Sequence, residues 1–127
     1  MSGWIAVDFD GTLATYGTWL GPDHMGEPIA PMVDRVKRWL AEGREVRIFT
    51  ARVGPSGRAN GVGQIDDDSF ASQQRRQIQQ WCRQYIGQEL AVTATKDFGM
   101  VELWDDRAVQ VRMNTGEIVG HSTRGLA

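Results

Sequence analysis

Short apolar runs alternate along the chain with stretches whose apolar residues recur at helical spacing. The first run, Trp4–Val7, has four consecutive apolar residues, which is typical of a central strand buried on both faces. Three further runs, at 46–49, 90–93 and 100–104, predict three more strands. Strands that alternate with helices form a mostly parallel sheet covered on both faces. We therefore expect an α/β fold, a three-layer Rossmann-like sandwich.

Two amphipathic stretches predict the helices. Pro31 suits a first helical position and Gly43 supplies a stop, so one helix is expected between them. A second helix is expected to begin at Asp68 or Ser69, either of which can cap it, and to end before Gly87. The residues that recur at helical spacing are Met32, Val33, Val36, Trp39 and Leu40 in the first helix, and Phe70, Gln74, Ile78, Trp81, Cys82 and Tyr85 in the second.

The segments between these elements are predicted to be irregular. Residues 14–30 and 53–68 are rich in glycine, and loops of this length inside a compact domain are usually functional or mobile. Residues 108–113 and 117–119, joined by Asn114-Thr115-Gly116, predict a hairpin at the C-terminal edge of the sheet.

The composition is typical of a globular protein with one domain, expected over residues 1–127. Apolar residues make up 41% of the chain and the net charge is −2, so no basic excess indicates a polyanion as partner. Cys82 is the only cysteine, which excludes an intramolecular disulfide, and its apolar neighbours predict a core thiol. No apolar stretch approaches the roughly 20 residues of a membrane span, and the N-terminus does not resemble a signal peptide. We expect a cytoplasmic protein without membrane contact.

Polar residues that can take part in catalysis or metal binding follow the predicted strands. Asp8 and Asp10 come after the first strand, Thr50 ends the second, and Asp105 and Asp106 follow the last. Ligands bind at the carboxyl ends of strands in open α/β sheets, so these groups are expected to meet at one edge. Clustered carboxylates destabilise a fold unless a cation or a shared proton relieves their repulsion. Oxygen ligands of this kind suit Mg²⁺, whose remaining positions are filled by water and phosphate oxygens.

In their order along the chain, these residues resemble the motifs of the haloacid dehalogenase (HAD) superfamily of phosphohydrolases. The first motif, an Asp-x-Asp pair followed by x-Thr, is matched by Asp8-Phe9-Asp10-Gly11-Thr12. The second, a Ser or Thr at the end of the next strand, is matched by Thr50. Lys96 is the candidate for the third, a lysine upstream of the fourth strand, and Asp105-Asp106 match the acidic pair of the fourth. The four matches span residues 4–111.

The resemblance implies an enzyme, a phosphatase that hydrolyses a phosphomonoester through an aspartyl-phosphate intermediate. Asp8 would attack the phosphorus as the nucleophile. Asp10 would protonate the leaving oxygen and then activate water. Thr50 and Lys96 would bind the phosphoryl oxygens and stabilise the charge of the transition state.

The resemblance also implies a metal and a set of substrate contacts. Magnesium would bridge Asp8, the main-chain carbonyl of Asp10 and one carboxylate of Asp105 or Asp106, of which Asp105 is favoured. The neighbouring residues expected to contact the substrate are Gly11, Thr12, Ala51 and Arg52. For Arg52 a surface ion pair is the alternative.

Many members of the superfamily insert a cap domain over the site, and this chain has none, so it resembles a small capless type. Only the loops at 14–30 and 53–68 are long enough to reach over the site, where Trp19 can stack on a ligand and Arg58 can bind an anion. We expect an open site whose partner is a phosphorylated substrate, either a small molecule or a nucleic-acid end. The oligomeric state stays open, and Asp97 is a competing partner for the charge of Lys96.

Two other classes of function remain. A phospho-accepting signalling module that resembles response-regulator receivers would also use clustered acids, a threonine and a lysine. Receivers place the accepting aspartate at the end of the third strand, however, and the run at 90–93 ends without one. A binding protein on an inactivated scaffold is the third class, which the intact motifs disfavour. Three features of the sequence also have purely structural explanations. These are an Asx-type turn at Asp8-Asp10, solvation of His24 and an acidic helix N-terminus at 66–68.

Overall fold

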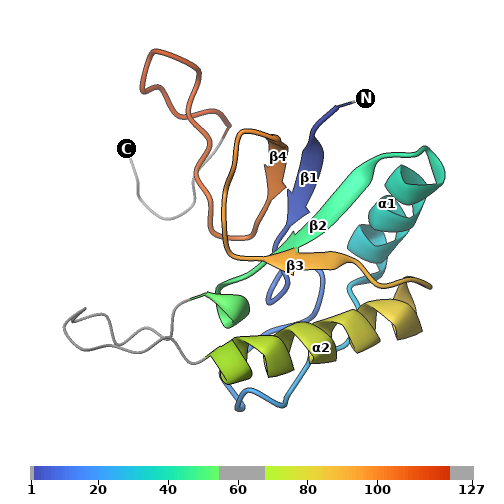
Figure 1. Ribbon diagram of the computed structural model, residues 1–127. Coiled ribbons are helices and arrows are strands. Elements are labelled where there is room, and N and C mark those ends of the chain that lie inside the picture. The colour runs from blue at the N-terminus through green and yellow to red at the C-terminus, as the bar shows by residue number, and fades with distance from the viewer. Residues whose placement is uncertain (1, 55–67, 121–127) are drawn as a thin grey trace.

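The protein, described by a computed structural model, is built on a four-stranded sheet whose strands all run parallel (Figure 1). The structure describes residues 2–54 and 68–120. The sheet has the order β3-β2-β1-β4, which places β1 in its interior, and all four residues of β1 are buried. The predicted α/β fold with a parallel sheet is thereby confirmed. Its strands are β1 (Trp4–Val7), β2 (Glu45–Phe49), β3 (Ala91–Thr93) and β4 (Met100–Trp104).

Two helices and one short 3-10 turn connect the strands. Helix α1 (Ala30–Ala41) follows β1, the turn η1 (Ala51–Val53) follows β2, and helix α2 (Asp68–Tyr85) leads to β3. Helix α1 has proline in its first turn, and the chain leaves it through Gly43, whose φ of +82° favours glycine. Both helices therefore agree closely with the sequence prediction.

One apolar core lies between the sheet and both helices. Ile5 pairs with Val46, and Val7 pairs with Ile48, so the side chains of each pair point to the same face of the sheet. These residues belong to one buried cluster that also takes in side chains from both helices: Met32, Val33, Val36 and Trp39 from α1, and Ile78, Trp81 and Cys82 from α2. Both helices therefore pack on the same face.

The opposite face carries no helix among the residues that the structure describes. Strands β1, β2 and β3 are successive neighbours, and right-handed crossovers that proceed in one direction leave their helices on one face. The return from β3 to β4 takes only residues 94–99, whereas a crossover helix needs about a dozen residues. The described residues thus form two layers instead of the three predicted. Leu103, which pairs with Ala6 on the second face, is 40% exposed.

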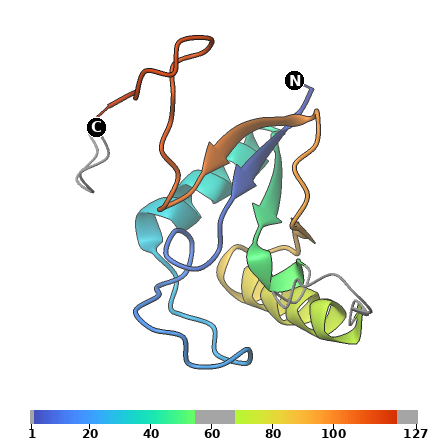
Figure 2. The same cartoon turned by 90° about the vertical axis from the view of Figure 1, so that its left-hand side faces the viewer.

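The irregular segments differ in how far they can be compared with the prediction. The segment between β1 and α1 is a loop, as predicted, and the arrowheads of β1 and β4 point toward it (Figure 2). Residues 55–67, which make up most of the predicted loop at 53–68 and include Arg58, lie outside the described residues. The predicted C-terminal hairpin is present in short form. A single bridge joins Val111 to Ile118, and this hairpin adds no strand to the sheet.

Two further predictions, on the Cys82 thiol and on membrane-spanning helices, can be compared with the described residues. Cys82 is buried in the core, and burial raises the pKa of its thiol to about 12, as a core thiol requires. None of the described helices has both the length and the apolar character needed to cross a membrane.

Candidate active site

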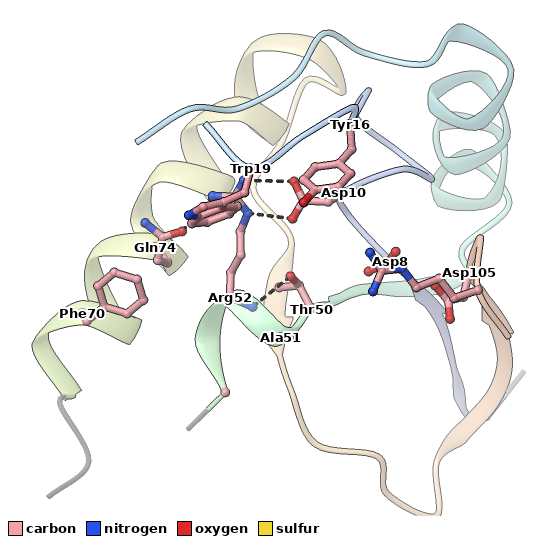
Figure 3. A pocket seen from close by; sticks show the side chains of 12 residues that line it. Asp8, Asp10, Tyr16, Trp19, Thr50, Ala51, Arg52, Phe70, Gln74 and Asp105 are labelled. Atoms are coloured by element: carbon pink, nitrogen blue, oxygen red, sulfur yellow. Dashed lines mark hydrogen bonds and ion pairs between the residues drawn. The ribbon is translucent and has the colours of Figure 1, made fainter. Parts of the chain in front are cut away.

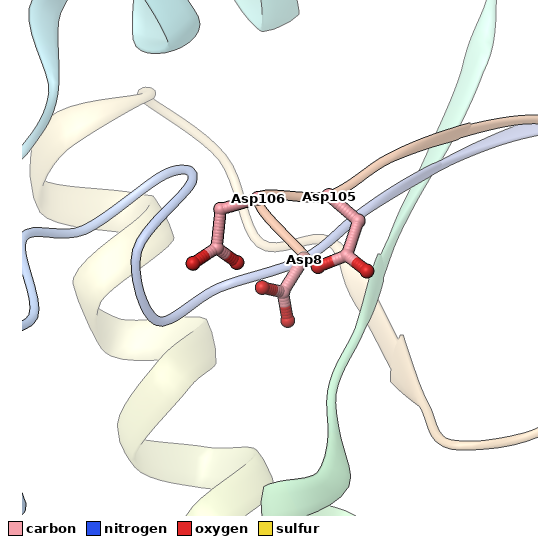
Figure 4. Close-up of side chains that lie close together, drawn as sticks. All are labelled: Asp8, Asp105 and Asp106. Atoms are coloured by element: carbon pink, nitrogen blue, oxygen red, sulfur yellow. The ribbon is translucent and has the colours of Figure 1, made fainter. Parts of the chain in front are cut away.

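Asp8 is brought to the site by the pairing of β1 with the edge strand β4. Its backbone N–H donates to the carbonyl of Trp104, the last residue of β4, at 2.9 Å. This bond extends the β1–β4 ladder by one residue and brings Asp8 beside Asp105 and Asp106. One carboxylate oxygen from each of these three residues lies within 4.8 Å of the others (Figure 4). We call them the acidic triad, and their convergence agrees with the prediction from the strand ends.

The electrostatics of the acidic triad centre on Asp8. Burial, the hydrogen bond and charge of Asp105, and the hydrogen bond of Asp106 together raise the pKa of Asp8 to about 8. Near neutral pH the triad alone therefore favours a proton on Asp8. A divalent cation relieves the same repulsion, and three carboxylates form a donor set that fits Mg²⁺. Both Asp105 and Asp106 belong to this set, so the structure does not single out the favoured Asp105.

Gly11 and Thr12 support the acidic triad from the turn after β1. Gly11 has a φ of +88°, and a Cβ atom there would lie 2.6 Å from Oδ2 of Asp106. Thr12 is buried, and its hydroxyl lies 3.4 Å from Oδ2 of Asp8 and 3.4 Å from Oδ1 of Asp106. Both residues were predicted as substrate contacts. In the structure they lie against two acids of the triad, and neither is among the residues that line the recess described below.

Asp10 belongs to a second cluster, in which its carboxylate is held by Arg52. Nε of Arg52 donates to Oδ2 of Asp10 at 2.8 Å, and Nη2 donates to Oδ1 at 2.9 Å. The pair is therefore two-pronged, which is the strong arrangement for a guanidinium and a carboxylate. Figure 3 shows Asp10 turned toward Arg52, while Asp8 and Asp105 lie together at the other side of the site.

The remaining donors of Arg52 are also engaged. Nη1 donates to the Pro22 carbonyl at 3.0 Å and to Oε1 of Gln74 at 2.9 Å, and Nη2 donates to the His24 carbonyl at 3.0 Å. A guanidinium has five N–H donors, so none is left for a phosphoryl oxygen. This corrects both predicted roles of Arg52. The side chain is buried, and it holds Asp10 in place instead of binding substrate or forming a surface ion pair.

The loop between β1 and α1 is tied down around this arginine. The Arg52 guanidinium lies 4.9 Å from the ring centre of Trp19, so the indole covers it. Nε1 of Trp81 donates to the Gly26 carbonyl at 2.9 Å, which joins the loop to α2. His24 is exposed, and its contribution to the cluster is its carbonyl. The loop is therefore a fixed wall of the site.

Thr50 is placed as its motif predicts. Its N–H donates to the Thr93 carbonyl at 2.9 Å, which continues the β2–β3 pairing to the carboxyl edge of the sheet. Its side-chain oxygen accepts from the Arg52 N–H at 3.2 Å and caps the turn η1. The hydroxyl proton remains available to a ligand oxygen, because the bond from Arg52 uses the oxygen only as an acceptor.

A recess of about 560 Å³ connects the two clusters. Figure 3 shows Asp8 and Asp105 at one side of it, Phe70 and Gln74 at the other, and Thr50 between them. The recess is lined by Asp8, Asp10, Tyr16, Trp19, Thr50, Ala51, Arg52, Gly54, Phe70, Gln74, Asp105 and Arg107. Its volume lies in the range typical of small-molecule sites. Ala51, predicted as a substrate contact, is one of the residues that line this recess.

Lys96 is the predicted site residue that the structure does not bring to this recess. It is exposed in the connection between β3 and β4 and is not among the lining residues. Ala94, two residues earlier, lines a smaller recess together with Asp8 and Asp105. Asp97 does not pair with Lys96. It accepts from Nε1 of Trp4 at 2.8 Å, and this bond and the Gly99 N–H lower its pKa.

The sequence reading missed four side chains that line the recess, those of Tyr16, Phe70, Gln74 and Arg107. Gln74 carries a signal that could have found it, because an amide interrupts the apolar stripe of α2 and is fully buried. Its amide group donates to Pro22 at 2.9 Å and to Gln77 at 3.2 Å, so it is a structural link between α2 and the loop. The other three have no such pattern in the sequence.

The comparisons with known proteins bear on the fold. The sequence matches no family profile and no curated protein. A solved structure of a conserved protein from Bacteroides thetaiotaomicron is similar, with a TM-score of 0.54 and 21% identity over 86% of this chain and 79% of that one. At this identity the likeness shows a shared α/β fold and nothing about activity.

Proposed function

We propose that this protein is a magnesium-dependent phosphohydrolase of the HAD type that acts on a phosphomonoester. The observation that carries the proposal is that Asp8, Asp105, Thr50 and Asp10 line one recess, with Asp106 completing the acidic triad beside it. A cluster of acids is costly for folding unless a ligand compensates it, and a hydroxyl beside it suits a phosphoryl group. The resemblance of the motifs points to the same chemistry.

In the first half of the reaction, Asp8 is the nucleophile. One of its carboxylate oxygens attacks phosphorus and forms an aspartyl-phosphate, while the bond from phosphorus to the leaving oxygen breaks. The leaving oxygen takes a proton from Asp10. A protonated Asp10 can keep one of its bonds to Arg52 while its other oxygen donates to the leaving group, so the arginine orients the acid throughout.

In the second half, water attacks the phosphorus and gives its proton to Asp10. The bond between Asp8 and phosphorus breaks, so inorganic phosphate leaves and both aspartates return to their starting states. Thr50 donates its hydroxyl to a phosphoryl oxygen in both halves. Magnesium, held by the acidic triad and the Asp10 carbonyl, would supply charge neutralisation between the nucleophile and the anionic substrate.

The direct test is hydrolysis of an aryl phosphate with magnesium, compared between the wild type and Asp8→Asn. We expect the substitution to remove nearly all turnover, because the amide keeps the shape of Asp8 but is a far poorer nucleophile. Asp34→Asn, on the exposed side of α1, is the matched control and should keep full activity. Retention of more than a tenth of the activity in Asp8→Asn, a loss under about 1.4 kcal/mol in barrier height, would contradict the proposal.

The role of Lys96 follows from the resemblance and needs its own test. We expect Lys96→Ala to lower turnover by at least tenfold, about 1.4 kcal/mol, because an ammonium then no longer stabilises the phosphoryl charge. Lys37→Ala removes the chain's other lysine and is the control. If both variants keep wild-type turnover, Lys96 has no part in the reaction, and Arg107, which lines the recess, becomes the candidate cation.

A further inference from the structure

The recess has two chemically different sides. Asp8, Asp105 and Thr50 offer oxygen atoms on one side, where the phosphoryl group would bind. Tyr16, Trp19 and Phe70 bring three aromatic rings to the rest of the wall. Asp10 lies between the two sides (Figure 3).

Two of the rings are exposed although the loop that carries them is well anchored. Tyr16 is 41% exposed and Trp19 is 51% exposed. Beside them, Thr15 donates its N–H to the Glu27 carbonyl at 2.8 Å, and the other end of the loop is tied to Trp81. The loop thus holds aromatic surface at the recess without burying it, and a bound aromatic group would cover that surface.

Two of the polar side chains near the rings, Arg52 and Gln74, are already committed. Arg52 uses all five of its N–H donors, and the Gln74 amide uses both of its own. These groups therefore have no donor with which to read the edge of a ring. Recognition on this side falls to stacking, which accepts any flat ring.

We propose that the recess takes a phosphomonoester whose leaving group carries a flat aromatic ring, and that a nucleoside monophosphate is the chemical class that fits. This inference rests on the proposed phosphohydrolase function and extends it to the substrate. The volume of about 560 Å³ is far more than a phosphoryl group fills, and it leaves room for a sugar and a base. Because stacking is the main contact, discrimination among bases is weak.

The test compares a nucleotide with the same molecule lacking its base. Adenosine 5′-monophosphate and ribose 5-phosphate share the phosphoryl group and the sugar, so the ratio of their kcat/KM values isolates the ring. We expect the wild type to favour the nucleotide by at least tenfold. The four nucleoside 5′-monophosphates are expected to lie within about fivefold of one another. An oligonucleotide with a terminal phosphate, assayed alongside, distinguishes a free nucleotide from a nucleic-acid end as the source of the ring.

Three variants show which residues produce the ratio. Trp19→Ala and Phe70→Ala should each lower the nucleotide-to-ribose ratio by at least threefold, and Trp19→Phe should restore most of it. A purely structural role would lower kcat/KM for both substrates alike and leave the ratio unchanged. Leu20→Ala removes an exposed apolar side chain from the same loop without touching the recess, and it should keep the wild-type ratio.

The outcomes separate this inference from the function on which it rests. If the wild type hydrolyses neither an aryl phosphate nor any of these substrates, the phosphohydrolase proposal fails. If it hydrolyses ribose 5-phosphate as efficiently as the nucleotide, the phosphohydrolase stands and the aromatic substrate class is overturned. A ratio that survives both Trp19→Ala and Phe70→Ala overturns the assignment of these rings.

Discussion

The site has two clusters, the acidic triad and the pair of Asp10 with Arg52, and their negative charges are compensated in opposite ways. Asp10 meets a guanidinium that binds both of its oxygens and is itself fully hydrogen-bonded. In the acidic triad, by contrast, the pKa of Asp8 is raised to about 8, because burial and neighbouring carboxylates disfavour its charge. The protein supplies the positive charge for Asp10, whereas the raised pKa of Asp8 favours a proton or a bound cation there.

Under the proposed function, this difference assigns the two clusters different roles. A carboxylate whose direction is fixed by a two-pronged ion pair is suited to transfer a proton at a defined position. A group of acids that repel one another is suited to bind a cation, since the repulsion is relieved only when the ligand arrives. Folding stability should therefore depend on Arg52 in one cluster, and on pH and magnesium in the other.

The largest expected effect comes from breaking the compensated cluster. Arg52→Ala leaves Asp10 and Gln74 without their partner in a buried setting, and we expect it to lower the free energy of unfolding by about 3 kcal/mol. Arg52→Lys keeps the charge but loses the two-pronged hydrogen bonding to Asp10. Its free energy of unfolding should lie between those of Arg52→Ala and the wild type. Urea denaturation measures both.

The control for Arg52 is an ion pair of the same types on the surface. Arg47 and Glu45 approach to 2.7 Å, with the Glu45 side chain 54% exposed. Glu45→Ala should lower the free energy of unfolding by less than about 1 kcal/mol, because solvent screens an exposed ion pair. If Arg52→Ala costs no more than Glu45→Ala, the contrast between the two clusters does not hold.

A smaller effect is expected from the turn that allows the acidic triad to close. Gly11→Ala places a Cβ atom against Asp106 and forces a residue with a side chain into a φ of +88°. We expect a loss of about 2 kcal/mol in the free energy of unfolding. Gly17→Ala, where a Cβ atom would meet nothing within 4 Å, should change it by less than about 0.5 kcal/mol. Equal stability of the two variants would show that Asp106 does not need this close approach.

The smallest expected effect is the stabilisation of the acidic triad by magnesium, which is measured against the dependence of the triad on pH. Folding raises the pKa of Asp8 from an ordinary value near 4 to about 8, so the native state binds a proton more tightly than the unfolded chain does. The contribution of Asp8 to the free energy of unfolding is therefore fully present below about pH 4 and declines as the pH rises to about 8. Magnesium at ten times its dissociation constant should restore about 1.4 kcal/mol at pH 8.

Thermal melting in metal-free buffer between pH 5 and pH 8, followed by addition of magnesium, measures this response. Asp8→Asn should flatten the decline with pH, whereas Asp34→Asn should keep the wild-type slope. Asp105→Ala should remove the stabilisation by magnesium. Loss of that stabilisation in Asp106→Ala but not in Asp105→Ala would assign the metal contact to the other acid of the pair.

Much of the acidic triad could be predicted from the sequence. A run of four apolar residues identifies β1 as a buried strand, and the carboxyl ends of parallel strands necessarily share an edge. Asp8 and Asp105 were therefore expected to meet without any knowledge of side-chain positions. The same reasoning placed Thr50, because each of these residues stands at the end of a strand and its position depends only on the strand.

The role of Arg52 was not predictable in this way. The five oxygen atoms that accept from it come from the turn after β1, the loop before α1 and the buried face of α2, and only the folded chain brings them to one point. The same holds for the aromatic side of the recess, where Trp19 and Phe70 approach from separate segments. Lys96 was predicted from its place in the order of motifs. That order does not determine where the connection between β3 and β4 places its side chain, and the structure leaves it away from the recess.

The sequence by itself determined the elements, the parallel sheet and the edge at which the acids meet, because strand periodicity and strand direction are local properties. Tertiary structure alone decided that both helices cover one face, because this follows from the order β3-β2-β1-β4 and the right-handed crossovers. It also decided which acid is compensated. Charge compensation depends on distances between segments far apart in the chain, and these distances exist only once the chain has folded.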